Sequence, residues 1–351
     1  MYIVIAIIAF GLLIAVHELG HFTAAKLLHV RVNEFAIGMG PKILRKQGKE
    51  TLYSLRLLPF GGFCAMDEDE NPQDARSFTA QKRWRRIVIL AAGGTANILA
   101  AIIIVIVLVA GMDNFVGTTI MELADGFPDN GEQGIMVGDT IVSINGERLY
   151  YMEDFAFIMQ FAKGNHVDIV VRRDGEKVML NNYQLEMHEY VTDGTTRLRY
   201  GITFNYIESN FFEGLKYSGY TTINFVRIIR FSIAQLISGA AGVNDLAGPV
   251  AIVDAMNDIG RSSPTIGAAL ANIANFIAFI GVNIAIVNLL PIPAMDGGRI
   301  LFIFLTWAIE KIIRRRLDTK YEKYIHMTTM VLLMGFMVFI LVNDVLRIVN
   351  G

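Results

Sequence analysis

Residues 2–21 read YIVIAIIAFGLLIAVHELGH, an apolar run that ends in three titratable side chains. Residues 2–16 carry no charge, and with the residues that follow they reach the length of about 20 residues that spans a bilayer. His17 and His21 are four residues apart, so a helix presents both imidazoles on one face. This HExxH spacing suits two ligands of one zinc ion, with Glu18 as general base. Ionisable groups inside a membrane span usually mark a functional site; the alternative is a helix that ends at the membrane surface here.

The composition is typical of a multi-span membrane protein. The chain has 351 residues, of which 53% are hydrophobic and only 18% are charged. Its formal net charge of −2 argues against nucleic acid as a main partner. The single cysteine, Cys64, excludes an internal disulfide and is interpreted as a packed thiol. The N-terminus lacks the basic region of a signal peptide, so the first apolar run is expected to be a retained anchor.

Four segments are long and apolar enough to span a bilayer: 1–22, 87–111, 267–290 and 326–347. Lys and Arg gather in residues 22–86 and 299–323, and the positive-inside rule therefore places both loops in the cytoplasm. Both chain termini are then extracytoplasmic. Segment 211–240 is apolar but contains Arg227 and Arg230, so it is predicted to be an amphipathic helix on the outer membrane surface. A fifth span there is the alternative, and it conflicts with the basic loop that follows.

The segment between the second and third spans is predicted to contain a small extracytoplasmic domain. Its expected elements are strands at 141–144 and 167–171, hairpin turns at Asn145-Gly146 and Asp174-Gly175, and a helix at 151–162. The chain accordingly divides into residues 1–111 with the first two spans, 112–206 as this domain, 207–266 as the amphipathic helical linker on the outer surface, and 267–351 with the last two spans.

A catalytic zinc needs a third protein ligand and an open water position. Asp296 is the best candidate, because it lies in NLLPIPAMDGG (288–298) at the cytoplasmic end of the third span. The two prolines break a helix, and the two glycines permit close backbone approach. The alternative role for Asp296 is to cap a helix that starts near Arg299. The weaker candidates for the third ligand are His29, Glu34, His166, His188 and His326.

Together, the HExxH motif and the NxLPxPxxDGG motif resemble the site-2 protease family of intramembrane zinc metalloproteases. The resemblance covers nearly the whole chain and is closest to the bacterial type that has a single PDZ domain and acts in regulated intramembrane proteolysis. It implies that His17, His21 and Asp296 bind Zn²⁺ and that Glu18 activates water.

Three further segments match this family. LPFGGF (58–63) resembles its membrane-associated β-loop, which implies that Gly61, Gly62 and Phe63 offer an edge strand to the substrate. Asn283 and Asn288 match two asparagines that hold the substrate backbone; the alternative is helix–helix packing. AGPVAI (247–252) resembles a motif that precedes the third span.

Residues 134–146, GIMVGDTIVSING, resemble the core of a PDZ domain. The family therefore implies an α-helical multi-pass membrane protein with four transmembrane helices, an inserted α+β PDZ-like domain and a membrane-associated β-loop. One departure lies in the second span, where AAGGTAN (91–97) lacks the family's usual Gly-Pro pair before the asparagine. This puts a local kink in doubt, but not the chemistry.

The resemblance implies a protease of the cell membrane whose active site lies near the cytoplasmic side. Its substrates are expected to be single-span membrane proteins embedded in the lipid bilayer, such as an anti-sigma factor or a signal-peptide remnant, cut after a first extracytoplasmic cleavage. The PDZ-like domain is expected to exclude bulky substrates or to bind substrate or adaptor C-termini. One alternative is an inactive scaffold, which the two intact motifs argue against. Another is a transporter, which the lack of an internal repeat in the sequence argues against.

Overall fold

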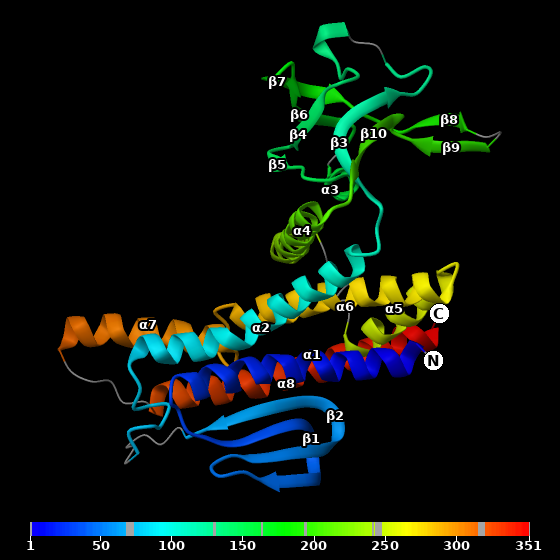
Figure 1. Ribbon diagram of the computed structural model, residues 1–351. Helices are drawn as coiled ribbons and strands as arrows, with labels where there is room; N and C mark the ends of the chain where they lie inside the picture. The colour runs from blue at the N-terminus through cyan, green and yellow to red at the C-terminus, as the bar shows by residue number, and fades with distance from the viewer. Residues whose placement is uncertain are drawn as a thin grey trace. The chain divides into compact units, whose positions relative to one another are not determined.

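Two compact units make up the chain in the computed structural model: unit 1 comprises residues 1–108 and 225–351, and unit 2 comprises residues 109–224. The structure describes residues 2–67, 74–128, 131–162, 164–192, 195–240, 242, 248–314 and 320–350. Figure 1 labels the helices and strands of both units.

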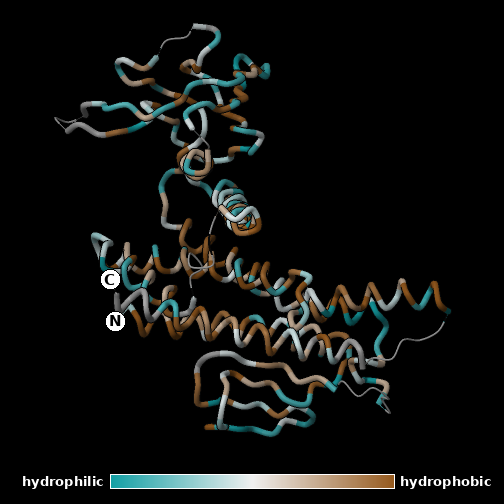
Figure 2. The backbone as a smooth tube through the Cα atoms, turned by 180° about the vertical axis from the view of Figure 1, so that it is seen from behind, coloured by the Kyte–Doolittle hydropathy of each residue, from teal (hydrophilic) through white to brown (hydrophobic). Residues whose placement is uncertain are grey.

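Unit 1 is built on long apolar helices. Within the described residues, four helical stretches are long and apolar enough to cross a membrane: α1 (Tyr2–Leu27), α2 (Arg83–Val109), α6 (Ile266–Leu289) and the part Met327–Asp344 of α8 (Lys320–Asn350). Figure 2 shows these helices mostly in the colour of hydrophobic residues. The prediction of four spans is confirmed. The helices α1 and α2 continue past the apolar runs, and α1 ends shortly before His29, which adopts a left-handed conformation (φ 61°).

Helices α1 and α2 approach each other closely at Gly20. A Cβ atom at this position would lie 2.4 Å from the carbonyl oxygen of Ala92 and 2.8 Å from the methyl group of Ala96. Because only a glycine fits, the backbones of the two helices can come together beside the HExxH turn. His17 and His21 are both buried as a result.

An antiparallel sheet of β1 (Val32–Gln47) and β2 (Leu52–Met66) follows α1. Both strands bend, so each pairs with the other in two places. Residues 32–37 of β1 lie between residues 62–66 and 52–55 of β2. Residues 52–55 also pair with residues 44–47 of β1. Within the described part of the chain, 62–66 and 42–47 are therefore the two edges. The rings of Phe35 and Tyr53 contact the ring of Phe22 and attach the sheet to α1. The sequence predicts only the loop at 58–63, since the other residues show no alternation of apolar and polar side chains.

Helix α5 (Pro249–Ser262) is joined to α8 by a buried carboxylate. Asp344 accepts hydrogen bonds from the backbone N–H groups of Gly248 (3.3 Å) and Ala251 (3.2 Å) at the start of α5. A Cβ atom at Gly248 would lie 2.4 Å from the Oδ2 atom of Asp344. This explains the glycine of the AGPVAI motif, whose first residue, Ala247, lies outside the described residues. Met256 of α5 packs in a small core with α1 and α6.

The remaining helices of unit 1 are α7 (Asp296–Ile313) and part of α4 (Phe211–Ser238), whose residues up to Asn224 belong to unit 2. The sequence predicts α4 as an amphipathic helix, and the structure confirms that the segment is helical. Helix α4 is not among the candidate membrane helices of the described residues.

Unit 2 contains a six-stranded sheet with strand order β10-β3-β4-β6-β7, in which β5 pairs with β4. The strands of this sheet are β3 (Asn114–Leu123), β4 (Thr140–Ile144), β5 (Glu147–Arg148), β6 (His166–Arg173), β7 (Glu176–Gln184) and β10 (Ile202–Glu208). A 3-10 turn at Gly131–Gln133, the helix α3 (Met152–Phe161) and a hairpin of β8 (His188–Thr192) and β9 (Thr195–Arg199) complete the unit. Residues of β4, β6 and α3 share one hydrophobic core. The predicted strands, turns and helix of this segment are confirmed; the sequence does not predict the β8–β9 hairpin.

Candidate metal centre

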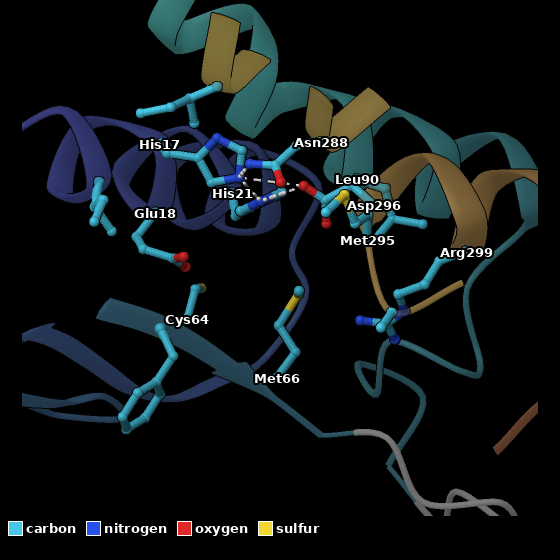
Figure 3. Close-up of a pocket in the computed structure, with 14 residues that line it drawn as sticks. His17, Glu18, His21, Cys64, Met66, Leu90, Asn288, Met295, Asp296 and Arg299 are labelled. Carbon is cyan, nitrogen blue, oxygen red and sulfur yellow. Dashed lines mark hydrogen bonds and ion pairs between the residues drawn. The ribbon is translucent and has the colours of Figure 1, made fainter. Parts of the chain in front are cut away.

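Three side chains from distant parts of the chain converge in unit 1. The Nε2 atoms of His17 and His21 lie 3.2 Å apart, and each lies 3.2 Å from the Oδ2 atom of Asp296. Figure 3 shows the three side chains pointing toward one another. The two histidines come from α1, whereas Asp296 is the first residue of α7. Folding thus brings together the two motifs that the sequence contains almost 280 residues apart.

The geometry of this cluster suits zinc. Ligand atoms held about 2.0–2.1 Å from a zinc ion in a tetrahedral arrangement lie about 3.3–3.4 Å from one another. The three observed separations of 3.2 Å come close to this value. Two imidazole nitrogens and one carboxylate oxygen are a ligand set of a catalytic zinc site, which leaves the fourth position for water. Among the described His, Cys, Asp and Glu side chains, His17, His21 and Asp296 form the group that could hold a metal ion.

The turn before α7 positions Asp296. Helix α6 ends at Leu289, and Pro291 and Pro293 follow. A Cβ atom at Gly297 would lie 2.2 Å from the carbonyl oxygen of Leu289, and both Gly297 and its neighbour Gly298 are buried. The glycine pair therefore lets the start of α7 press against the backbone that leaves α6, which brings the carboxylate of Asp296 back toward α1.

Helix α2 orients the two histidines. The Nδ1 atom of His21 lies 2.8 Å from the backbone carbonyl oxygen of Ile89, so it donates a hydrogen bond to that oxygen and leaves Nε2 for a metal. A Cβ atom at Gly93 would lie 2.4 Å from the Nε2 atom of His21 and 2.8 Å from the Cε1 atom of His17. The glycine at position 93 thus makes room for both rings.

Glu18 and Cys64 line the same cavity of about 310 Å³. In Figure 3 the carboxylate of Glu18 points toward Cys64 in strand β2, whose backbone N–H lies within hydrogen-bonding reach. Burial, together with the nearby Glu18 carboxylate, raises the pKa of the Cys64 thiol to about 12. The thiol is therefore neutral near pH 7, which does not favour a role as nucleophile, and Cys64 does not belong to the metal cluster.

The predicted substrate-binding residues lie at different distances from the cluster. Asn288 lines the cavity, with its Nδ2 atom 3.4 Å from the Nε2 atom of His17, but Asn283 does not line it. The two are five residues apart, so a helix turns their side chains about 140° from each other. In the sheet, Phe63 lines the cavity, and a Cβ atom at Gly62 would lie 3.2 Å from the Cγ atom of Glu18.

Glu34, one of the weaker ligand candidates, is engaged within the β1–β2 sheet. Its carboxylate accepts hydrogen bonds from Ser54 (2.7 Å), Arg56 (2.9 Å) and Lys42 (3.0 Å). Although partial burial raises it, these hydrogen bonds lower the pKa of Glu34 to about 2. Glu34 is thus tied to the sheet and does not belong to the metal cluster.

None of the other weaker candidates that the structure describes belongs to the cluster. His29 follows α1 in a left-handed turn, and His166 and His188 belong to unit 2. The side chain of His326 lies outside the described ones.

Sequence reasoning missed the contribution of α2. The carbonyl oxygen of Ile89 belongs to no motif, and Gly93 is noted in the sequence only because the family's usual proline after a glycine is missing in AAGGTAN (91–97). The available signal is the run AAGGTA (91–96), because small residues inside a membrane span allow close packing of helices.

Comparison with known proteins gives consistent results. The model of Peptidase family M50 matches residues 5–336. A relative from Clostridium acetobutylicum named as a zinc metalloprotease is 37% identical over 354 residues, which cover 99% of this chain and 98% of the relative. A relative from Clostridium perfringens, also named as a zinc metalloprotease, is 36% identical over 351 residues, which cover 99% of each chain. The regulator of sigma-W protease RasP from Bacillus subtilis is 27% identical over 429 residues, 97% of each chain.

Proposed function

This chain belongs to peptidase family M50 and is a multi-pass, zinc-dependent membrane protease, and we propose that it cleaves peptide bonds inside the transmembrane segments of other membrane proteins. The observation that carries the proposal is the position of the metal cluster. His17 and His21 lie within a helix long and apolar enough to span the membrane, six to ten residues before its end at Leu27. At a rise of 1.5 Å per residue, the cluster lies about 9–15 Å inside that end of the helix.

We assign the zinc ligands as His17, His21 and Asp296. A zinc ion held by these three side chains would act as a Lewis acid, which would make water more acidic and polarise the scissile carbonyl group. Glu18 takes the proton of that water as general base and delivers it to the nitrogen of the departing peptide. The hydrogen bond to Ile89 holds His21 in the tautomer that presents Nε2. Asn288, beside His17, can donate a hydrogen bond to the substrate backbone.

The edge strand 62–66 is proposed to hold the unwound substrate. A helical substrate hides its peptide groups, so cleavage requires local unwinding into an extended segment. Phe63 and Cys64 on this edge line the cavity beside Glu18, and the strand has a pairing partner on one side only within the described residues. Addition of the substrate as a further strand would satisfy its main-chain groups next to the catalytic residues. Gly61 permits the turn into the edge strand because it has a φ of 82°.

The β1–β2 sheet is proposed to lie against the cytoplasmic side of the lipid bilayer, beside α1. It exposes a set of large apolar side chains: Ile37, Met39, Ile43, Leu44, Leu55, Leu57 and Leu58. A soluble protein rarely exposes so many on one element, and lipid is the natural solvent for them. The sheet runs along α1 within unit 1, as Figure 1 shows. Substrate, sheet and metal cluster would then meet at one depth.

The basic loops support an orientation with both termini outside and the active site near the cytoplasmic side. Residues 112–206 would then form an extracytoplasmic domain between membrane parts 1–111 and 267–351, with 207–266 as the linker on the outer surface. We propose that this domain is PDZ-like and admits only substrates whose external part has already been removed. Its sheet, with helix α3 in the shared core, supports this proposal.

This function corresponds to the second cut in regulated intramembrane proteolysis. The name of the Bacillus subtilis relative, a regulator of sigma-W, favours an anti-sigma factor as substrate class. Remnants of signal peptides have the same chemistry, an apolar span with a short external stub.

The test is to find where the scissile bond lies. The purified chain is placed in liposomes with a single-span reporter that has a short external stub, and the products are measured by mass spectrometry. The proposal predicts cleavage within the apolar span, which stops when zinc is chelated and returns when zinc is added. Cleavage only in the external stub would contradict it. A second reporter with a folded external domain tests the filter: cleavage at the same rate would contradict the role proposed for residues 112–206.

A further inference from the structure

The two histidines of the cluster differ in how their second ring nitrogen is held. The Nδ1 atom of His21 is bonded to the carbonyl oxygen of Ile89, whereas the Nδ1 atom of His17 is buried without a hydrogen-bond partner among the described residues. In Figure 3 this nitrogen of His17 is turned away from Asp296. A histidine that binds a metal through Nε2 carries its proton on Nδ1, and that N–H needs an acceptor when it is buried.

Helix α2 holds a second buried group of this kind, Asn97. Its side chain is 0% exposed, and neither its Oδ1 nor its Nδ2 atom has a partner in the described part of the chain. Buried amides are almost always hydrogen-bonded, so two unpaired atoms on one side chain call for an explanation. An amide in this position offers both a donor and an acceptor.

Gly93 of α2 is a neighbour of both groups. Asn97 lies four residues after Gly93, on the same face of α2, and side chains tilt toward the N-terminus of their helix. The amide of Asn97 therefore reaches back over Gly93, which has no side chain to block it. The Cβ position of Gly93 is 2.8 Å from the Cε1 atom of His17, and Nδ1 is bonded to that carbon. Both unpaired groups are therefore close to Gly93, one on the same helix and one on α1.

We propose that Asn97 is a positioning residue for the zinc site, which acts on His17 through one buried water molecule. The Nδ1–H of His17 donates to the water, and the water donates to the Oδ1 atom of Asn97. A buried water typically makes about three hydrogen bonds, and these polar groups supply partners for it. The water bridge would keep the proton of His17 on Nδ1, as the hydrogen bond to the Ile89 carbonyl oxygen does for His21. The proposal rests on the assignment of His17 as a zinc ligand.

The test measures zinc affinity rather than cleavage, on full-length protein in detergent with a competing chelator. Asn97→Leu removes both polar atoms at similar volume, and it is expected to weaken zinc binding about 10–100-fold, the usual effect of losing a group that orients a metal ligand. Asn97→Asp keeps an acceptor and is expected to restore affinity to within about 3-fold of wild type. The zinc-free Asn97→Leu protein should unfold at a temperature no lower than that of zinc-free wild type.

Asn224→Leu is the matched control, since Asn224 also has a buried amide oxygen without a partner in the described residues but belongs to α4 in unit 2, not to α2 beside Gly93. It should leave zinc affinity unchanged. Wild-type affinity in Asn97→Leu, or no recovery in Asn97→Asp, would overturn the inference. His17→Ala separates the two proposals: if it binds zinc as wild type does, the metal site itself is misassigned. If it loses zinc while Asn97→Leu does not, only the role of Asn97 fails.

Discussion

The metal cluster and the β1–β2 sheet lie side by side but are built in opposite ways. The cluster is enclosed by helices that meet through glycines, and its two histidines are only 6% exposed. The sheet has two unpaired edges within the described residues and exposes apolar side chains such as Ile43 and Leu57. The proposed chemistry is thus placed in a closely packed, buried part, and the proposed binding of substrate on an edge whose main-chain groups lack a strand partner within the described residues. Substitutions in the two parts should therefore affect zinc and substrate separately.

The largest effect is expected from Asp296→Ala. It removes one of the three proposed ligands, so zinc retention should fall by more than the about 10–100-fold that is typical when an outer partner of a ligand is lost, and cleavage should fall with it. Metal analysis of the purified variant checks this. Asp254→Ala is the control, because Asp254 is exposed on α5 and does not belong to the cluster. Full zinc and activity in Asp296→Ala would place the third ligand elsewhere.

Gly93→Ala should damage the cluster without removing a ligand. Its methyl group would lie 2.4 Å from the Nε2 atom of His21, so the ring must shift, and zinc affinity should drop about 10–100-fold. Gly335→Ala in α8 is the matched control, since a Cβ atom there has no heavy atom within 4 Å among the described residues. Equal zinc affinity in the two variants would show that the packing of α2 on the histidines is unimportant.

Phe63→Pro tests the other part. Proline removes one backbone N–H from the strand that forms the proposed docking edge and disturbs its backbone beside the cavity, which should slow cleavage about 5–10-fold while zinc content stays at the wild-type level. Lys46→Pro places the same change on the far edge of the sheet and should have little effect. Phe63→Leu, which keeps the N–H, separates the backbone from the ring. Loss of zinc in Phe63→Pro would contradict the division between cluster and sheet.

Cys64→Ala should have the smallest effect, less than about 2-fold on cleavage and none on zinc, because a neutral thiol performs no chemistry. With a pKa of about 12, the thiol ionises only as the pH rises toward that value. Alkylation by a maleimide should therefore be slow at pH 7 and accelerate with pH. Rapid alkylation at pH 7 would show that the thiol is less buried than its environment in strand β2 indicates.

The sequence predicts the parts of this molecule that depend on local pattern. Long apolar runs, the HExxH spacing and the turn signals at Asn145-Gly146 are such patterns. Other features arise only from contacts between distant segments. The hydrogen bond from His21 to Ile89 is accepted by a backbone carbonyl oxygen, and every residue type has one, so the sequence does not predict it. The sequence does not predict that β1 and β2 pair in two places. A half-buried strand is recognised by alternating apolar and polar residues, and this sheet lacks that alternation because apolar side chains also lie on its exposed faces. Asn283 and Asn288 look equivalent in sequence, and only the turn of α6 separates them.

The most direct test is to measure zinc content and cleavage on the same preparations of wild type and Glu18→Gln in liposomes. Gln is similar in size but cannot accept the proton of the attacking water. We predict full zinc in both proteins and cleavage by wild type only, with a reduction of at least about 100-fold in the variant. Cleavage by Glu18→Gln at the wild-type rate, with equal zinc, would contradict the assignment of Glu18 as the general base at this metal centre.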